Sequence, residues 1–533
     1  MKEEVMNVIR EKGLLLEREI FDLLNSFQHP RDAKELLEGL ERFSGQKIIN
    51  RAVLNKNFGF VKNFVSNLNG ESKTEVENVI IKLGLSLEIT KETAIVEKKE
   101  NFDKLKDISR KNLENLRNDF KIFYSTTRND KKLEVADFVG NFRARYHQLQ
   151  KILMNRPDLQ NLVSINKIGS DRNNYTIIGI VSEKRVTKNK NLIITFEDLT
   201  GKISTLIKFD KVEVFKKAEE LLLDDIVAVR ASGSRDMLFV NDIFFPDAFN
   251  GEKVRFENEV NVAFLSDIHA GGAKHLQKSF ENFLEWINSN DETARKIKYI
   301  MISGDNVDGV GIFPGQENLL KLKSMEEQYA LLASYLKQIP KHITMFMCPG
   351  QHDAVRVAEP QPIIGRRYAA PLYDIENLIL VSNPSLIKLL ENEKEFKILM
   401  YHGDSIHTFI HEIPELRSQK LSPAKAVRHM LKRRHLFPLH SEAIYIPNAE
   451  KDNLVISEVP DVVCTGEVHR IDVENYNGVL IMTGSCWQGQ TPFEEKVGNV
   501  PEPCKVPVLN LKTRELKILD FGNEEELREL HIK

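Results

Sequence analysis

The chain has 533 residues, too many for a single hydrophobic core, so two or three domains are expected. Its 75 basic and 78 acidic residues give a formal net charge of −3, which carries no global signature of nucleic-acid binding and leaves such binding to a local patch or a partner. Four cysteines without a CxxC pair argue against a disulfide framework or a thiolate zinc site, and favour a reducing compartment.

Residues 1–68 are predicted to form a small helical module. Val5, Val8 and Ile9 repeat at helical spacing, and Asp32 is a candidate N-cap before a second amphipathic run. This charged segment lacks the apolar core of a signal peptide, and no later stretch reaches the length of a membrane span. We therefore expect a cytoplasmic protein that makes no contact with a membrane.

Residues 69–136 are predicted to be a charged linker, in part disordered, because Lys, Glu, Asp and Asn dominate it and apolar anchors are few. Residues 137–168 are then predicted to hold an amphipathic helix that leads into a barrel and ends before Pro157. The apolar side chains of this helix follow one another at steps of four, three and four: Phe142, Tyr146, Leu149 and Leu153.

Residues 169–250 change to an alternating apolar pattern, with turn residues between roughly five short strands. This layout resembles the OB-fold, a five-stranded barrel often used to bind oligonucleotides. Few aromatic residues suited to base stacking lie on these strands, so nucleic-acid contact and a merely solvated hairpin tip are equally compatible with the basic residues. A third alternative is that the barrel docks against the next domain. The basic residues are Lys184, Arg185, Lys188 and Lys190.

Residues 251–533 alternate short apolar runs with helical segments, which is typical of buried strands in a layered α+β domain. Five of these runs end in polar residues, and ligand sites form where the loops beyond such strand ends converge. The mixture of oxygen and nitrogen ligands suits Mn²⁺, Zn²⁺ or Fe²⁺ better than Mg²⁺ or Ca²⁺. The five strand ends carry Asp267 and His269; Asp305; Gln351, His352 and Asp353; His402 and Asp404; and Glu467 and His469.

The series D-x-H, GD-x-x-D, GQHD, YHGD and GEVH at these ends resembles the motifs of the calcineurin-like metallophosphoesterases, a family with a β-sandwich flanked by helices and two metals. The resemblance gives His352 the catalytic role and places Asp308 and Asp353 behind the histidines, where they orient the rings. Carried over position by position, it implies seven metal ligands: Asp267, His269 and His469 for the first metal, Asp305 between the two, and Gln351, His402 and Glu467 for the second.

Longer stretches narrow the resemblance to the small subunits of archaeal family D DNA polymerases, over roughly Asp137 to the C-terminus. They read "GDNVDGVGIFPGQE", "PGQHDAVRVAEPQP", "LSPAKAVRHMLKRRHLFP" and "GSCWQGQTPF". Two positions depart from the wider pattern, because Gln351 replaces an asparagine and Glu467 replaces a histidine. Both changes fall on the second metal, so this site is expected to be harder, weaker or empty.

The resemblance implies a small subunit of a heteromeric replicative polymerase that carries a metal-dependent 3′–5′ exonuclease for proofreading, with synthesis in a separate large subunit. It implies two divalent ions, Mn²⁺ foremost and Zn²⁺, Fe²⁺ or Mg²⁺ as alternatives. The expected partners are the large catalytic subunit, a single-stranded or mismatched DNA 3′ end, and a sliding clamp. Gln351 and Glu467 also motivate a scaffold subunit with weakened catalysis, and an unrelated phosphoesterase on the same fold is a third alternative.

Two further features have no place in the motif series. The run Lys432–His435, "KRRH", fits contact with a nucleic-acid phosphate and a solvated helix face about equally. Six histidines outside the motifs are expected to be solvated or structurally bonded: His275, His407, His411, His429, His435 and His440.

Overall fold

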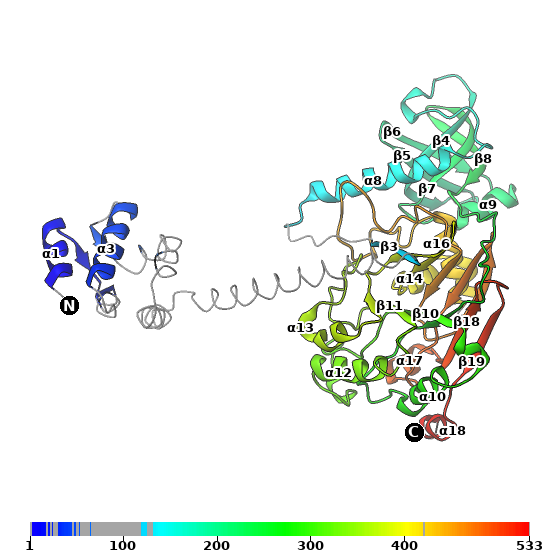
Figure 1. Ribbon diagram of the computed structural model, residues 1–533. Helices are drawn as coiled ribbons and strands as arrows, with labels where there is room; N and C mark the ends of the chain where they lie inside the picture. The colour runs from blue at the N-terminus through cyan, green and yellow to red at the C-terminus, as the bar shows by residue number, and fades with distance from the viewer. Residues whose placement is uncertain are drawn as a thin grey trace. The chain divides into compact units, whose positions relative to one another are not determined.

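The computed structural model describes residues 3–17, 20, 21, 24, 30–44, 47–49, 53, 64, 119–124, 132–418 and 422–531 (Figure 1). The chain divides into two compact units, Met1–Arg117 and Asn118–Lys533. In the described part of the first unit, α1 (Glu3–Lys12) contacts α3 (Pro30–Ser44), and Lys12 Nζ lies 3.1 Å from Glu41 Oε2. The two-residue strands β1 (Leu15–Leu16) and β2 (Ile48–Ile49) pair in parallel beside these helices.

Most of the predicted linker at 69–136 lies outside the described residues, but one part of it is a strand. Residues 120–124 form β3 (Phe120–Tyr124), which pairs with β13 (Ser385–Glu391) at the edge of a sheet. Phe120 is buried and packs edge-to-face on Phe346, with ring centroids 5.1 Å apart. The interpretation of this piece as linker is wrong, because the alternating inward residues of five positions suffice for an edge strand even in a charged context.

The helix α8 (Val135–Met154) packs its apolar side on the barrel. Tyr146, Leu149 and Leu153 lie in one cluster with side chains of the barrel wall, and the Tyr146 hydroxyl donates to the Ile178 carbonyl at 3.0 Å. The adjoining side of α8 carries buried polar residues, Asn141 and Arg145, that contact Asp452. This helix therefore joins the barrel to the rest of the second unit.

Five strands form a closed barrel in the order β4-β5-β6-β8-β7 (Figure 1). In the chain, the helix α9 (Val212–Glu219) lies between β6 and β7. The short helix η1 (Ile165–Lys167) precedes the barrel. The residues of β5 alternate between buried and half-buried, as expected for a wall with one face inward. The strands are β4 (Asn173–Val186), β5 (Leu192–Asp198), β6 (Gly201–Ile207), β7 (Ile226–Ser234) and β8 (Met237–Phe244).

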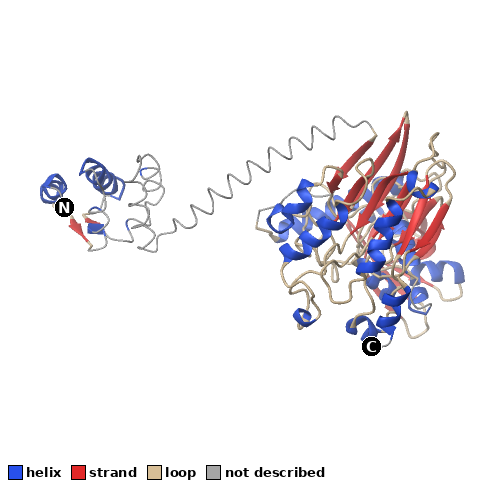
Figure 2. Ribbon diagram, turned by 60° about the horizontal axis from the view of Figure 1, so that its bottom comes forward, coloured by secondary structure: helices blue, strands red, loops and turns tan. Residues whose placement is uncertain are grey.

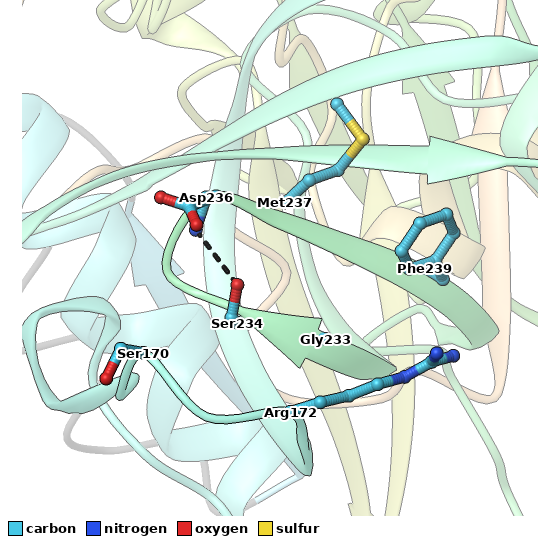
Figure 3. A pocket seen from close by; sticks show the side chains of 7 residues that line it. All are labelled: Ser170, Arg172, Gly233, Ser234, Asp236, Met237 and Phe239. Carbon is cyan, nitrogen blue, oxygen red and sulfur yellow. Dashed lines mark hydrogen bonds between the residues drawn. The ribbon is translucent and has the colours of Figure 1, made fainter.

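One of the four basic residues predicted at the hairpin, Lys184, is bound to the backbone, whereas Arg185, Lys188 and Lys190 are exposed. Lys184 donates to the carbonyls of Glu219 and Leu221, at 2.7 and 2.8 Å, so it holds the end of α9. A separate pocket lies at the β7–β8 hairpin, where the Arg172 guanidinium lies 5.7 Å from the centre of the Phe239 ring (Figure 3).

The remainder of the second unit contains two six-stranded sheets that face each other, with helices on both outer sides (Figure 2). Between the sheets, Phe264, Met301 and Phe346 of the first sheet pack against Phe396 and Ile398 of the second. The first sheet has the order β12 (Leu378–Leu380), β11 (Thr344–Cys348), β10 (Ile297–Ser303), β9 (Asn261–Leu265), β18 (Lys505–Asn510) and β19 (Leu516–Asp520). The second has the order β16 (Asp472–Tyr476), β17 (Val479–Thr483), β15 (Val462–Thr465), β14 (Lys394–Met400), β13 and β3.

Amphipathic helices bury the outer faces of both sheets. Over the first sheet lie α10 (Gln277–Ile287), α12 (Met325–Leu336) and α13 (Arg366–Ala369), and over the second lie α14 (Ser405–Glu412) and α16 (Pro423–Arg433). The predicted α+β class with a separate five-stranded barrel is confirmed. Shorter helices complete the unit: α11 (Glu292–Arg295), η2 (Gln316–Asn318), η3 (Ala370–Asp374), α15 (Pro414–Ser418), α17 (Pro492–Val497) and α18 (Glu524–His531).

The KRRH run at the end of α16 is neither a phosphate-binding patch nor a solvated face. Arg433 is buried and its Nε lies 2.9 Å from Asp225 Oδ1 of the barrel domain. Arg434 donates to three backbone carbonyls, and Lys432 pairs with Glu220. Both interpretations of the run are wrong, because carboxylates distant in sequence pair with Lys432 and Arg433, backbone carbonyls accept from Arg434, and these contacts fix the barrel against α16.

All four cysteines are buried and unpaired. Among the described helices, none combines the length and the apolar character that a bilayer crossing requires.

Candidate metal centre

The predicted ligands come together at one edge of the sandwich. β9, β10 and β11 are parallel neighbours in the first sheet, and β14, β15 and β17 are parallel neighbours in the second. The loops that carry the five motifs follow the carboxyl ends of β9, β10, β11, β14 and β15. Backbone hydrogen bonds tie the loops together, since Asp267 N donates to Gly304 O at 3.0 Å and Gly466 N donates to His402 O at 2.7 Å.

Five of the predicted ligands have a left-handed backbone, a conformation that non-glycine residues seldom adopt and that costs about 1–3 kcal/mol each. Such a cluster indicates that the loops are held in strained conformations to aim these side chains. The φ angles are 50° at Asp267, 47° at His269, 45° at Asp305, 73° at Glu467 and 58° at His469.

Asp267, His269 and His469 form the first group that can hold a metal. The Nδ1 atom of His269 lies 3.2 Å from Asp308 Oδ1, and that of His469 lies 2.8 Å from Glu494 Oε1. Because these carboxylates accept from Nδ1–H, the two Nε2 lone pairs face each other at 3.2 Å. Two facing lone pairs repel unless a cation lies beside them, which fits a metal ligated by both rings.

Asp305 lies between this group and the next. Its Oδ1 accepts from the backbone N–H of His352 at 2.9 Å. Its Oδ2 lies 3.3 Å from His402 Nε2, 3.8 Å from His352 Nε2 and 4.0 Å from His269 Nε2. Each ring approaches through Nε2, so this oxygen has the position of a ligand shared by two metals.

Asp305 and His402 form a further candidate group with Asp267, and the predicted ligands Gln351 and Glu467 belong to the same side of the centre. His402 Nδ1 donates to the Ser303 carbonyl at 2.8 Å, which leaves the Nε2 lone pair facing Glu467 Oε2 at 3.1 Å. Gln351 donates its Nε2–H to Asp404 Oδ1 at 2.9 Å, and this contact fixes which end of the amide is free. Gly350 is required here, since a Cβ on it would lie 2.7 Å from His402 Nε2 and collide with Asp305.

Three of the predicted ligands keep a buried atom without a hydrogen-bond partner: Asp267 Oδ2, Gln351 Oε1 and His402 Nε2. Unpartnered buried polar atoms are uncommon in folded proteins and call for an explanation such as an ion. Oxygen and imidazole nitrogen are suitable ligands for divalent ions such as Mn²⁺ and Zn²⁺. The residues present therefore fit a divalent metal site, including the two substituted positions.

The electrostatics of the centre favour positive charge. Burial acts to raise the pKa of Asp305, but His402 and His352 outweigh it and hold that pKa well below its ordinary value. Burial acts to lower the pKa of His402, but Asp305 and Glu467 reverse this effect and raise the pKa well above its ordinary value. The carboxylates thus attract cations, whether protons on the rings or metal ions.

His352 lies at the open side of the centre. Its side chain is 22% exposed, against 5% for Asp305 and 1% for His402. Its Nδ1 lies 2.6 Å from the Asp308 carbonyl oxygen and its Nε2 points toward Asp305. The imidazole is held at one nitrogen and can exchange a proton with a bound molecule at the other.

Asp353 differs from its expected role, because its hydrogen bonds are with loop backbone, Asn306 and Tyr329 and not with a histidine. Its Oδ2 accepts from Gly350 N and from Asn306, and its Oδ1 accepts from the Tyr329 hydroxyl at 2.9 Å. Asp308 does lie behind His269, at 3.2 Å. Asp353 therefore fixes the loop that carries Gln351 and His352.

Several residues of the centre were missed by sequence reasoning. Glu494 belongs to a capping box at Thr491, which by itself indicates only a helix start. Asp404 was visible in the YHGD motif, but its amide partner was not. His407, expected to be solvated or structural, lies at the rim with Nε2 3.6 Å from Glu467 Oε1. His275 is structural, with its Nδ1 3.0 Å from the Ile268 carbonyl oxygen.

Replacing Glu494 with glutamine is expected to weaken Mn²⁺ binding about 10- to 100-fold, because residues behind a ligating histidine fix its tautomer and basicity. Glutamine keeps the size and the capping position, so the fold should persist. Calorimetric titration of Mn²⁺ measures the change. The neighbouring Glu495 is exposed, so Glu495→Gln is the matched control, and equal affinities for both variants would contradict the role of Glu494.

Comparisons with known proteins agree with the motif series. Residues 262–471 match the family model that describes the B-subunits of DNA polymerases alpha and epsilon. The chain is 39% identical over 400 residues to the DNA polymerase II small subunit of Pyrococcus furiosus, which covers 73% of this chain and 64% of the relative. It is 34% identical over 411 residues to the DNA polymerase II small subunit of Methanothermobacter thermautotrophicus, over 76% of this chain and 83% of the relative.

The match covers 64% of the length of the Pyrococcus relative, which is slightly less than two thirds. Among solved structures, an archaeal phosphodiesterase aligns with 49% of this chain and 99% of its own at 13% identity. Its TM-score of 0.25 is too low to carry an argument.

Proposed function

The chain belongs to the family of archaeal DNA polymerase II small subunits, the family D small subunits that its motifs resemble, and from this premise we propose that it is the exonuclease-bearing subunit of a heteromeric replicative polymerase. The large catalytic subunit is the proposed partner and performs synthesis. The proposed substrate is a DNA 3′ end, single-stranded or mismatched. A sliding clamp stays a prediction from the resemblance.

The proposed domain assignment follows the predicted ranges. Residues 169–250 are assigned to an OB-fold, supported by the closed order of strands and by the helix between the third and fourth. Residues 251–533 are assigned to a calcineurin-like phosphoesterase domain. Residues 1–68 are assigned to a helical module joined by the linker at 69–136, and residues 137–168 lead into the barrel.

The observation that carries the proposal is the cluster of Asp267, Asp305 and His402, in which Asp267 Oδ2 and His402 Nε2 are buried without a hydrogen-bond partner. Two divalent ions are proposed, Mn²⁺ foremost. When bound, such ions polarise a phosphodiester and lower the pKa of a water molecule so that it attacks phosphorus near neutral pH. The proposed ligands are Asp267, His269 and His469 for one ion, Asp305 for both, and Gln351, His402 and Glu467 for the other.

The chain's own catalytic group is His352. Burial acts to lower its pKa, but Asp305 and the Asp308 carbonyl outweigh this effect and raise it above its ordinary value, which favours the protonated ring. The proton on Nε2 passes to the departing 3′ oxygen as the bond between phosphorus and that oxygen breaks. The attacking water supplies the new oxygen on phosphorus, and the product is a nucleoside 5′-monophosphate.

The test is Mn²⁺-dependent digestion of a 3′-labelled mismatched primer by the purified chain, alone and with its large subunit. His352→Ala is expected to lower kcat about 10²- to 10⁴-fold, the usual contribution of a general acid. Because His352 is not a proposed ligand, its Mn²⁺ affinity should stay within about twofold of the wild type. The comparison also excludes a contaminating nuclease, which the variant would not affect.

Gln351 and Glu467 favour one other function, a scaffold subunit with weakened catalysis. Equal and negligible digestion by wild type and His352→Ala, repeated with the large subunit present, would favour the scaffold. Hydrolysis of a phosphomonoester without action on DNA would instead favour an unrelated phosphoesterase.

A further inference from the structure

An apolar rim lies beside the metal centre, and the described residues of the second unit leave its side chains exposed. It consists of Val310, Ile312 and Phe313, whose residues are 43%, 40% and 38% exposed. The surrounding sequence, Gly309–Gly315, contains no charged residue. Single exposed apolar residues are common, but three within four positions at the mouth of a polar site indicate a surface that binds something.

The rim is adjacent to the catalytic histidine. The His352 carbonyl oxygen and two side-chain carbons of Ile312 all lie within 3 Å of the position that a Cβ on Gly309 would occupy. The Asp308 carbonyl, one residue before Gly309, contacts His352 Nδ1 at 2.6 Å. The loop that carries the rim is therefore in direct contact with the backbone and the ring of His352.

Two buried glutamines hold the rim in place. Gln328 accepts from Gly309 N at 2.9 Å and donates to Gly309 O at 3.0 Å. Gln316 accepts from Ile312 N at 2.9 Å and donates to the Asp308 carbonyl at 2.8 Å. Both glutamines are fully buried, so the loop presents its apolar residues on a fixed frame.

We propose that this rim binds the terminal base of the DNA 3′ end by stacking against Phe313 and Ile312, and so selects ends whose last base is unpaired. The inference rests on the proposed exonuclease function. The loop sequence contains no cation, so it lacks the charge that dominates phosphate binding, and its exposed apolar side chains favour a base over a phosphate. A mismatched base leaves the helix at the lowest cost, and every base offers an aromatic face to a phenylalanine.

The experiment measures binding, so that it does not depend on cleavage. Fluorescence anisotropy would report the Kd for two primer–templates with a hydrolysis-resistant terminal phosphorothioate, one ending in a mismatched nucleotide and one in an abasic nucleotide, with Mn²⁺ present. Phe313→Ala is expected to weaken binding of the mismatched end about tenfold, the effect of losing one stacked base, and to leave the abasic end unchanged. Phe313→Tyr should restore the wild-type preference.

Phe249 provides the matched control, since it is 74% exposed and lies next to Asn250, whose N–H donates to Asn477 O. Asn477 precedes β17, so this position is at the opposite end of the sheet from the metal centre. Phe249→Ala should therefore bind both ends like the wild type. An equal preference for base over abasic end in wild type and Phe313→Ala would overturn the rim proposal.

The two proposals can fail separately. If the wild type digests DNA and its discrimination against the abasic end does not depend on Phe313, the rim proposal fails alone. If neither the wild type nor His352→Ala digests DNA but Phe313→Ala still loses the base-dependent binding, the exonuclease fails and the rim stands.

Discussion

Asp305→Asn is expected to reduce Mn²⁺-dependent hydrolysis of a 3′ end by about 10³-fold or more. A bound metal contributes several kcal/mol of transition-state stabilisation, and each ~1.4 kcal/mol is tenfold in rate. Asp305 Oδ2 faces the Nε2 atoms of three histidines, so the charge removed is the one that both proposed metals share. Asparagine can still accept the His352 N–H through Oδ1, which preserves the loop.

Two measurements check this result: kcat on the labelled primer and the number of manganese ions bound per chain. The loss of kcat should accompany a loss of bound metal, unlike in His352→Ala, where metal binding persists. Asp236→Asn, at an exposed position on the barrel, is the control for loss of a carboxylate elsewhere. A variant that keeps two ions and most of its rate would rule out a bridging role for Asp305.

The clustering of the motif residues was predictable because each motif combines a buried apolar run with a polar end. A polar residue that follows a buried strand lies at the carboxyl edge of the sheet, and this can be inferred from the local sequence alone. Asp267 and Asp305 illustrate this, since Asp267 follows a strand that is buried throughout and Asp305 follows one that is buried except at Lys298. Their left-handed backbone could not be predicted, because strain at a non-glycine residue depends on the hydrogen bonds of the neighbouring loops.

The partners of the ligands were not predictable, because they are distant in sequence or hidden in a local motif. Glu494 reads as a helix cap, and only the fold places its second oxygen 2.8 Å from His469. Arg433 reads as part of a basic run, but its partner Asp225 is 208 positions away. A charge pattern in the sequence shows which residues can ionise, but it does not show whether an opposite charge lies beside them in the fold.

The largest loss of stability is expected when the buried polar network that joins α8 to the loop at Asp452 is disrupted. Asp452 Oδ2 accepts from Arg145 Nε at 2.7 Å and from Asn141 and His435, both at 3.1 Å. Arg145 and Asp452 are 1% and 3% exposed at their side chains. Removing one partner of a buried pair costs about 3–5 kcal/mol, because the other charge stays buried without compensation.

Asp452→Asn is therefore expected to lower the hydrogen-exchange protection of the α8 amides by about 100-fold or more, the equivalent of about 3 kcal/mol. The matched control is Asp158→Asn, which breaks the pair of Arg156 with Asp158 near the end of the same helix. Asp158 is 43% exposed, and exposed pairs contribute at most about 1 kcal/mol. Similar losses of protection in the two variants would contradict a special role for the buried network.

The hydrogen-exchange protection of α8 should also depend on pH, because the ring of His435 in this network titrates. Its Nδ1 accepts from Phe437 N at 3.0 Å while its Nε2–H donates to Asp452, so the neutral ring uses both nitrogens. Burial, with Arg145 nearby, lowers the pKa of His435 to about 4, below the ~6.5 of an unfolded chain. The unfolded chain binds more protons between these values, so the stabilisation is complete above pH ~6.5 and is lost as the pH falls toward 4. The hydrogen-exchange protection of the α8 amides, corrected for intrinsic exchange, should decline between pH 7 and pH 5 more steeply in the wild type than in His435→Gln. The glutamine amide of this variant can still donate to Asp452, but it does not titrate.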